Sequence, residues 1–145
     1  MLSYGQQPKV RNYFPMPNEI FHLDLSDGAI LVYAFLMYCE DRKTYQCYPS
    51  YATIGKAIKR SENSVAKYAR ELEKKRLIYT EPTEVTLKDG RRHNGTLLYT
   101  IRPISEAVEY AYEQQMLRLQ AECRHQKVMQ KLQKMQGSIK KQEKA

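Results

Sequence analysis

The chain has 145 residues and a formal net charge of +8, with 42% hydrophobic and 28% charged residues. This length suits one compact domain with an extension. The longest apolar stretch, residues 29–37, is too short to cross a bilayer, which argues against a membrane-spanning protein. The N-terminus lacks the apolar region of a secretion signal, so we expect a soluble, cytoplasmic protein with no membrane partner.

The excess positive charge is concentrated in the middle of the chain. Residues 1–49 hold four Lys and Arg against five Asp and Glu, residues 50–103 hold twelve against six, and residues 104–145 hold eight against five. A basic segment favours an anionic partner, nucleic acid first and a membrane surface second. A solvated lysine-rich surface is the alternative interpretation.

The three cysteines, Cys39, Cys47 and Cys123, predict reduced thiols and no metal site. Their number is odd, and neither a CxxC spacing nor a cluster of His and Cys points to zinc. A disulfide between Cys39 and Cys47 stays open as an alternative.

Residues 1–20 are expected to form an extended arm, because Pro8, Pro15 and Pro17 oppose a helix. A disordered tail is the alternative. A helix is then predicted from Ser26, a favoured N-cap, through the apolar residues 29–38. Residues 40–48 are polar and are expected to form a loop.

Two short helical patterns follow, each preceded by a serine that is a good N-cap. Behind Ser50 one face carries Tyr51, Ile54, Ala57 and Ile58, and behind Ser61 one face carries Val65, Ala69 and Leu72. Only Lys59 and Arg60 separate the patterns. Two helices joined so tightly must cross steeply, which predicts a helix-turn-helix.

Strand-like segments follow at residues 77–80, 85–87 and 96–101. Asp89-Gly90 and Asn94-Gly95 are turn signals, so residues 88–95 are expected to join the last two strands in a hairpin. Beyond Pro103 the residues favour helix, and one long helix is predicted that frays past Gly137.

The expected fold class is mainly α with a small β-hairpin: a winged helix-turn-helix with an extended N-terminal arm and a long C-terminal helix. The predicted divisions are the arm at 1–20, the winged domain at 21–103 and the helix at 104–145. The apolar stripes of that helix are out of phase and form no continuous heptad repeat. Dimerisation through the helix and its packing on residues 29–38 are therefore equally favoured.

The second helix of a helix-turn-helix enters the major groove of DNA with its N-terminal part. Asn binds adenine, Lys and Arg reach guanine or phosphate, and Ser donates to phosphate. Glu62 is less expected against a polyanion. It can accept a hydrogen bond from cytosine N4, or its charge can stabilise the helix dipole. The predicted DNA-binding residues of this helix and of the preceding turn are Lys59, Arg60, Ser61, Glu62, Asn63, Ser64, Lys67 and Arg70. An ordinary surface helix is the competing interpretation.

The predicted hairpin carries basic residues that suit phosphate or minor-groove contact: Lys88, Arg91, Arg92 and His93. A solvated loop tip is the alternative. Lys74, Lys75 and Arg76 lie at the C-terminal end of the recognition helix, where stabilising the helix dipole is the favoured role.

No motif predicts an enzyme. His22, His93 and His125 are scattered, and the sequence has no nucleophile motif and no phosphate-binding glycine loop. We therefore expect no cofactor and no small-molecule substrate.

Residues 13–21, Leu25-Ser26 and residues 29–36 resemble the N-terminal domain of the replication-initiator A family, from plasmids and mobile elements of Gram-positive bacteria. Residues 47–58 and 61–78 look like the broader helix-turn-helix families related to it. The resemblance implies a DNA-binding replication initiator or accessory protein. The pattern departs at Arg76, where the family usually has glycine. Family members are usually longer and carry a further C-terminal domain, whereas the last residues of this sequence are expected to form a charged helix.

Three functional interpretations stand at this stage. The first is replication initiation, and the second, in the same chemical class, is transcriptional regulation. The third is a protein-interaction module that uses the winged helix as a scaffold. The expected partners are double-stranded DNA and a second copy of the chain.

Overall fold

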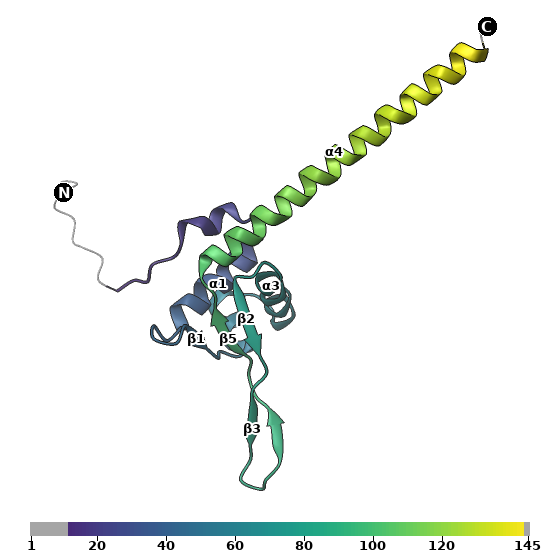
Figure 1. The fold of residues 1–145 in the computed structure, drawn as a ribbon. Coiled ribbons are helices and arrows are strands. Elements are labelled where there is room, and N and C mark those ends of the chain that lie inside the picture. The colour runs from purple at the N-terminus through teal and green to yellow at the C-terminus, as the bar shows by residue number, and fades with distance from the viewer. Residues whose placement is uncertain (1–11, 144–145) are drawn as a thin grey trace, which may run out of the picture. The chain divides into compact units, whose positions relative to one another are not determined.

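The computed structural model describes residues 12–143, except for the side chains of Val85, Arg92, His93 and Asn94. The elements in chain order are the 3-10 helix η2 (Asn18–His22), α1 (Asp27–Cys39), β1 (Gln46–Cys47), α2 (Tyr51–Ile58), α3 (Glu62–Lys74), β2 (Ile78–Glu81), β3 (Glu84–Thr86), β4 (Arg92–Asn94), β5 (Leu98–Ile101) and α4 (Ile104–Glu143) (Figure 1). Three helices, a twisted hairpin and a long C-terminal helix make this a winged helix-turn-helix, so the predicted fold class is confirmed.

The first three α-helices begin where the serines predict. Ser26, Ser50 and Ser61 are extended N-cap residues, and each Oγ accepts a hydrogen bond from the backbone N–H three residues further on. α2 ends at Lys59, whose φ of 59° is left-handed, and α3 begins three residues later. The turn is therefore as short as the sequence predicts.

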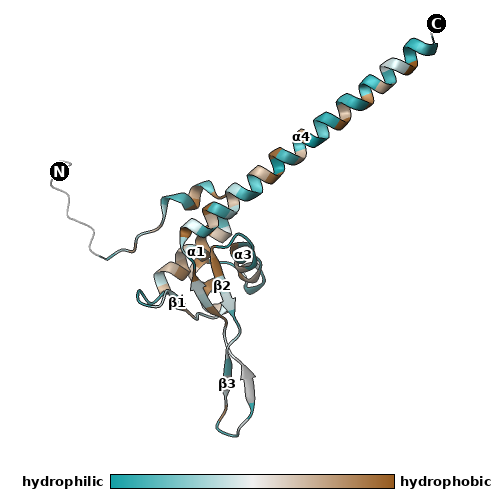
Figure 2. Ribbon diagram, in the orientation of Figure 1, coloured by the Kyte–Doolittle hydropathy of each residue, from teal (hydrophilic) through white to brown (hydrophobic). Residues whose placement is uncertain are grey.

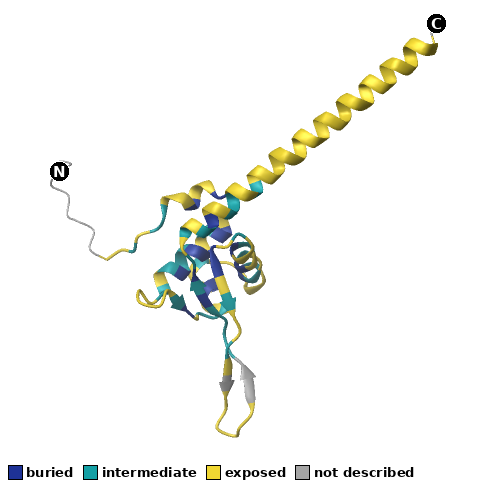
Figure 3. Cartoon of the chain, viewed as in Figure 1, coloured by how far each residue is buried: buried dark blue, intermediate teal, exposed yellow. Residues whose placement is uncertain are grey.

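The core lies where α1, α2 and α3 meet the sheet (Figures 2 and 3). Its fully buried side chains include Val32 and Leu36 of α1, Ile54 of α2, Val65 and Leu72 of α3, Leu77 just before β2, and Ile78 and Tyr99 of the sheet. α1 and α3 approach closely, since a Cβ on Gly28 would overlap the ring of Tyr68. Burial of one face of each helix leaves the opposite face of α3 exposed.

The main sheet has three antiparallel strands in the order β1-β5-β2. β2 pairs with β5 from Ile78 opposite Ile101 to Glu81 opposite Leu98, and β1 places Gln46 opposite Thr100. The expectation of a loop at 40–48 is therefore wrong at its end. A strand of two residues shows no alternation in sequence and forms because β5 offers a free edge.

The hairpin differs from its predicted pairing. Residues 96–101 were expected to pair with 85–87, but β5 pairs with β2, and β3 pairs with β4 through Glu84 opposite Asn94 and Thr86 opposite Arg92. Pro82 has no N–H for the ladder, which explains the break between the two sheets. Across the break, Gly95 N donates to Thr83 O at 2.6 Å, and Thr83 Oγ1 donates to Thr96 O.

The tip of the hairpin is at Asp89-Gly90, where Gly90 has a φ of 84°. Asn94-Gly95 is not a turn, because Asn94 belongs to β4. Arg92 and His93 accordingly lie in a strand and not at the tip, which corrects the prediction for these two residues. The hairpin projects beyond the three-stranded sheet as the wing (Figure 1).

The two ends of the chain show different structure. Most of the predicted arm, residues 1–11, lies outside the described residues, residues 12–17 form no helix or strand, and η2 buries Ile20. α4 continues through Gly137 to Glu143. Residues up to Ala107 form one compact unit and residues from Val108 a second, and only the first turn of α4 belongs to the former. Fraying past Gly137 stays a prediction.

Candidate nucleic-acid interface

One face of α3 is exposed and carries polar and basic side chains. Asn63, Lys67, Arg70 and Lys74 are all exposed, and their spacing of four, three and four residues places them on one side of the helix. Val65, Ala69 and Leu72 are buried on the other side. Lys74 joins this face as a fourth candidate. Its spacing from Arg70 was visible in the sequence, where the helix-dipole role was favoured instead.

The N-terminus of α3 combines a cap with a free donor. Ser61 Oγ accepts from Ser64 N at 3.2 Å and donates to Ser64 Oγ at 2.9 Å, so its hydroxyl is fully used by the cap. Ser64 Oγ accepts that bond and keeps its own hydrogen for another acceptor. Glu62 is exposed in the first turn, where its negative charge interacts favourably with the positive end of the helix dipole. Ser61 is therefore a positioning residue, and Ser64 is the hydroxyl able to meet a phosphate.

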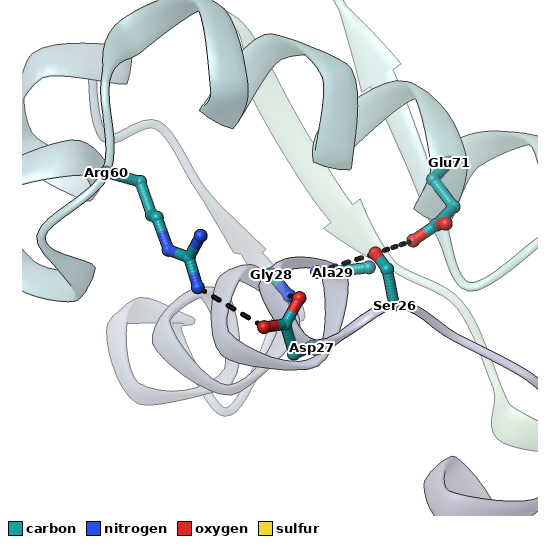
Figure 4. A network of polar contacts seen from close by, with 6 residues as sticks. All are labelled: Ser26, Asp27, Gly28, Ala29, Arg60 and Glu71. Carbon is teal, nitrogen blue, oxygen red and sulfur yellow. Dashed lines mark hydrogen bonds and ion pairs between the residues drawn. The ribbon is translucent and has the colours of Figure 1, made fainter.

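The turn before α3 holds Arg60 against α1. Arg60 Nη2 lies 3.3 Å from Asp27 Oδ2, and Asp27 Oδ1 accepts from Gly28 N at 2.7 Å (Figure 4). The Asp27 side chain is 80% exposed and that of Arg60 is 38% exposed, so solvent screens this ion pair and it contributes little to stability. The pair orients the guanidinium without burying it, and Arg60 can still exchange Asp27 for an anion. Lys59 is exposed in the same turn.

A second contact joins the start of α1 to α3. Ser26 Oγ donates to Glu71 Oε2 at 2.7 Å while it accepts from Ala29 N (Figure 4). One hydroxyl thus caps α1 and holds a residue in the last turn of α3. Together with the Arg60–Asp27 pair, this bond sets how α3 is presented.

Lys75 has a structural role that the sequence did not reveal. Its Nζ donates to the carbonyl oxygens of Leu23 at 3.0 Å and Asp24 at 2.6 Å, which lie in the segment before α1. The charge of Lys75 is therefore directed at backbone carbonyls, so we do not place it in the interface. Arg76 follows with a left-handed φ of 61°, a conformation that favours glycine.

The tip of the wing carries both signs of charge. Lys88 and Arg91 are exposed. Arg91 Nε lies 3.6 Å from Asp89 Oδ2, and Arg91 N donates to Asp89 Oδ1 at 3.2 Å. Asp89 shapes the turn and partly offsets the charge of the tip. The side chains of Arg92 and His93 lie outside what is described.

Within residues 12–143 no helix is long and apolar enough to cross a membrane. In the same part of the chain no group of three His, Cys, Asp or Glu residues is placed to hold a metal ion. All three cysteines are free thiols, and Cys47 Sγ lies 3.6 Å from Leu36 O. Burial raises the pKa of the Cys47 thiol to about 12, with smaller contributions from Cys39 and Glu40, so the thiol stays protonated at neutral pH.

Comparison with known proteins identifies the class of domain. Residues 23–78, from the end of η2 to the start of β2, match a family model described as "Helix-turn-helix domain". No curated protein matches the chain. The chain therefore carries a helix-turn-helix domain in winged form, a class of DNA-binding fold.

Three solved structures are similar to the chain. One is a possible transcriptional regulator from Methanosarcina mazei Go1, with 17% identity over 71% of this chain and 80% of that chain and a TM-score of 0.46. A mutant of Staphylococcus aureus MepR bound to an oligodeoxyribonucleotide has 22% identity over 83% and 84%, with a TM-score of 0.41. MepR itself, a transcription regulator of the multidrug efflux pump MepA, has 17% identity over 83% and 84%, with a TM-score of 0.39.

Proposed function

We propose that the protein binds double-stranded DNA in a sequence-dependent manner, with α3 in the major groove and the wing beside it on the backbone. The observation that carries this proposal is the exposed face of α3, where one amide and three cations follow each other at helical spacing behind a capped N-terminus. An α-helix fits the major groove, and the amide of Asn63 suits bidentate contact with adenine. Lys67, Arg70 and Lys74 supply positive charge along the same face.

The residues divide by the contact they make. Asn63 reads a base edge, with Arg70 or Lys67 available for guanine. Arg60, Ser64 and the tip of the wing bind phosphate, which fixes the position of α3 without reading sequence. Glu62 points from the first turn and either serves the dipole or accepts from cytosine. Substitution of a base-reading residue should therefore change base preference, and substitution of a phosphate-binding residue should weaken binding to all sequences.

The first prediction concerns base preference. Selection of bound sequences from a random DNA pool should show that Asn63→Ala relaxes preference at one position, at a cost of about 1–3 kcal/mol for a lost bidentate contact. Arg91→Ala should weaken all sequences alike. Arg124→Ala on α4 removes the same charge from an exposed position outside the interface and is the matched control. If Asn63→Ala and Arg91→Ala both bind like the parent, the assigned face is wrong.

The same variants separate DNA binding from protein scaffolding. Each phosphate contact releases counterions, so log affinity should fall steeply with log salt, and Arg91→Ala should make the slope shallower by about one unit. Affinity that does not depend on salt, or an absence of binding, would favour the protein-interaction module instead.

Transcriptional regulation is the role we propose for this DNA binding. Occupying a promoter needs only the contacts described above, whereas replication initiation also needs recruitment or opening of DNA, to which no residue of the described chain is assigned. Mapping the bound sites in the genome decides the point, because promoter sites support regulation and sites within an origin support the replication-initiator interpretation. Whether those sites lie on a plasmid, on an integrated mobile element or elsewhere in the chromosome also tests the link to mobile elements.

Two copies of the chain acting together are the second part of the proposal. Paired winged domains read palindromic sites, and a symmetric dimer is the commonest assembly of soluble proteins. α4 supplies such a helix, because its large apolar side chains beyond Val108 are exposed.

A further inference from the structure

A pocket on the side of α1 has no part in the proposed DNA contact. Its volume is about 340 Å³, within the lower range of small-ligand sites. Its lining comes from separate parts of the same compact unit: Pro17 before η2, Tyr33 and Met37 of α1, Tyr45 before β1, Ile101 at the end of β5, Pro103 after it, and Ile104 at the start of α4. Residues far apart in sequence thus enclose one apolar space.

An acidic group, Glu40, and a basic one, Arg102, line this mostly apolar pocket. Glu40, the C-cap residue of α1, is one of its lining residues. The Glu40 Oε2 atom is buried and has no hydrogen-bond partner within the described part of the chain. A buried carboxylate oxygen without a partner is costly, and native structures usually satisfy such groups. Glu40 as a whole is only half-buried, and its carboxylate is the negative charge in the lining that a positively charged donor in the pocket would offset.

Within the described residues, no ion pair joins Glu40 to a cation. Arg102, the other ionised lining residue, donates from Nε to Glu106 Oε2 at 2.5 Å. Burial raises the pKa of Glu40, and the positive charge of Arg42 lowers it only in part. The charge of Glu40 in turn helps raise the pKa of Tyr33 to about 12, after the larger effect of burial. The phenol of Tyr33 therefore stays protonated and uncharged.

We infer that this pocket binds a small organic amine, whose ammonium group pairs with Glu40 and whose apolar body packs against Tyr33, Met37 and Ile101. An ammonium group offers three donors and a charge opposite to that of the carboxylate. The phenyl or alkyl body of such a ligand matches the apolar walls. This inference does not depend on the proposed DNA binding, because none of the lining residues belongs to α3 or to the wing.

The experiment compares three probes of similar shape on the full-length chain: phenethylamine, the neutral 2-phenylethanol and the anionic 3-phenylpropanoate. Titration followed by NMR should show the amine binding about tenfold more tightly than the alcohol, as expected for a charged hydrogen bond, with the anion weakest. Shifts should appear at Tyr33 and Ile101. Equal affinity for amine and alcohol, absence of binding, or shifts confined to other residues would overturn the inference.

Two variants and a control test whether the preference for the amine depends on Glu40 and on this pocket. Glu40→Gln should reduce the preference for the amine over the alcohol to within about twofold, because the charge is lost but the shape is kept. Met37→Trp should fill the pocket and abolish binding of both probes, which keeps the test decisive if the Gln variant folds poorly. Glu113→Gln, an exposed residue of α4, should leave the preference unchanged. A preference that survives in Glu40→Gln contradicts the assignment of Glu40.

Discussion

Single residues at four turns of this domain adopt a backbone conformation that non-glycine residues rarely adopt. In the described chain, Asp24, Tyr45, Lys59 and Arg76 are the non-glycine residues with positive φ. Lys59 ends α2 and so forms the turn that aims α3. Arg76 lies just beyond α3, at the position where the resembling family has glycine. The sequence marked Arg76 as a departure, and the structure shows that the left-handed backbone is kept without glycine.

The second prediction tests this strain. Arg76→Gly should be more stable than Arg76→Ala by about 1 kcal/mol, because glycine adopts left-handed φ without a steric penalty and alanine does not. Comparing these two variants removes any contribution of the arginine side chain. The free energy of unfolding in urea is the measurement.

The matched control lies within α3. At Lys67, which is exposed in mid-helix, the order should reverse, and Gly should be less stable than Ala by about 1 kcal/mol. Equal stability of the two Arg76 variants would mean that the backbone at this position carries no strain.

At the scale of elements, the turn between α2 and α3 depends on a close approach of two backbones. Gly55 lies buried in α2, and its carbonyl accepts from Arg60 N at 3.0 Å. A Cβ on Gly55 would lie 2.5 Å from Arg60 O. Because the carbonyl oxygen belongs to the backbone, it cannot move aside without a shift of the turn. The sequence showed the short turn but not which glycine permits it.

The third prediction follows from that approach. Gly55→Ala should destabilise the domain by about 1–3 kcal/mol through overpacking, and it should also weaken DNA binding because α3 must shift. Thermal unfolding and DNA affinity are the two measurements. Gly137→Ala provides the control, because nothing lies within 4 Å of its added Cβ and alanine favours helix. If Gly55→Ala stabilised the protein as Gly137→Ala should, the close approach would be refuted.

At the scale of the whole molecule, α4 differs from the rest of the chain. From Gln115 to Glu143 every residue is exposed (Figure 3), including Val128, Leu132, Met135 and Ile139 at helical spacing of four, three and four. A helix of this length gains most of its stability from packing an apolar face. This stripe therefore favours contact with a second copy of the chain.

The fourth prediction is that the full-length chain sediments as two copies and that Leu132→Asp combined with Met135→Asp sediments as one. Buried aspartates would leave unpaired charges in the contact. Gln126→Asp combined with Gln130→Asp adds the same charge on the opposite side of α4 and should not change the mass. A single-copy mass for the parent at high concentration would remove dimerisation through α4 and leave the alternative that the helix packs on its own domain.

Local patterns were sufficient for the helices and for the candidate recognition face. Ser26, Ser50 and Ser61 act within three residues of themselves, and the spacing of Val65, Ala69 and Leu72 already separates a buried from an exposed side of α3. Such signals need only the geometry of one helix. The sequence by itself therefore determined the helix-turn-helix and the side chains that α3 exposes.

Only the tertiary structure decided which distant groups meet. Arg60 pairs with Asp27 across 33 residues, Lys75 holds carbonyls 51 and 52 residues away, and β5 pairs with β2 instead of with residues 85–87. The pocket around Glu40 likewise joins separate parts of the chain. Strand pairing and charge pairing over such separations depend on how the core places the elements, and no local period in the sequence encodes that placement.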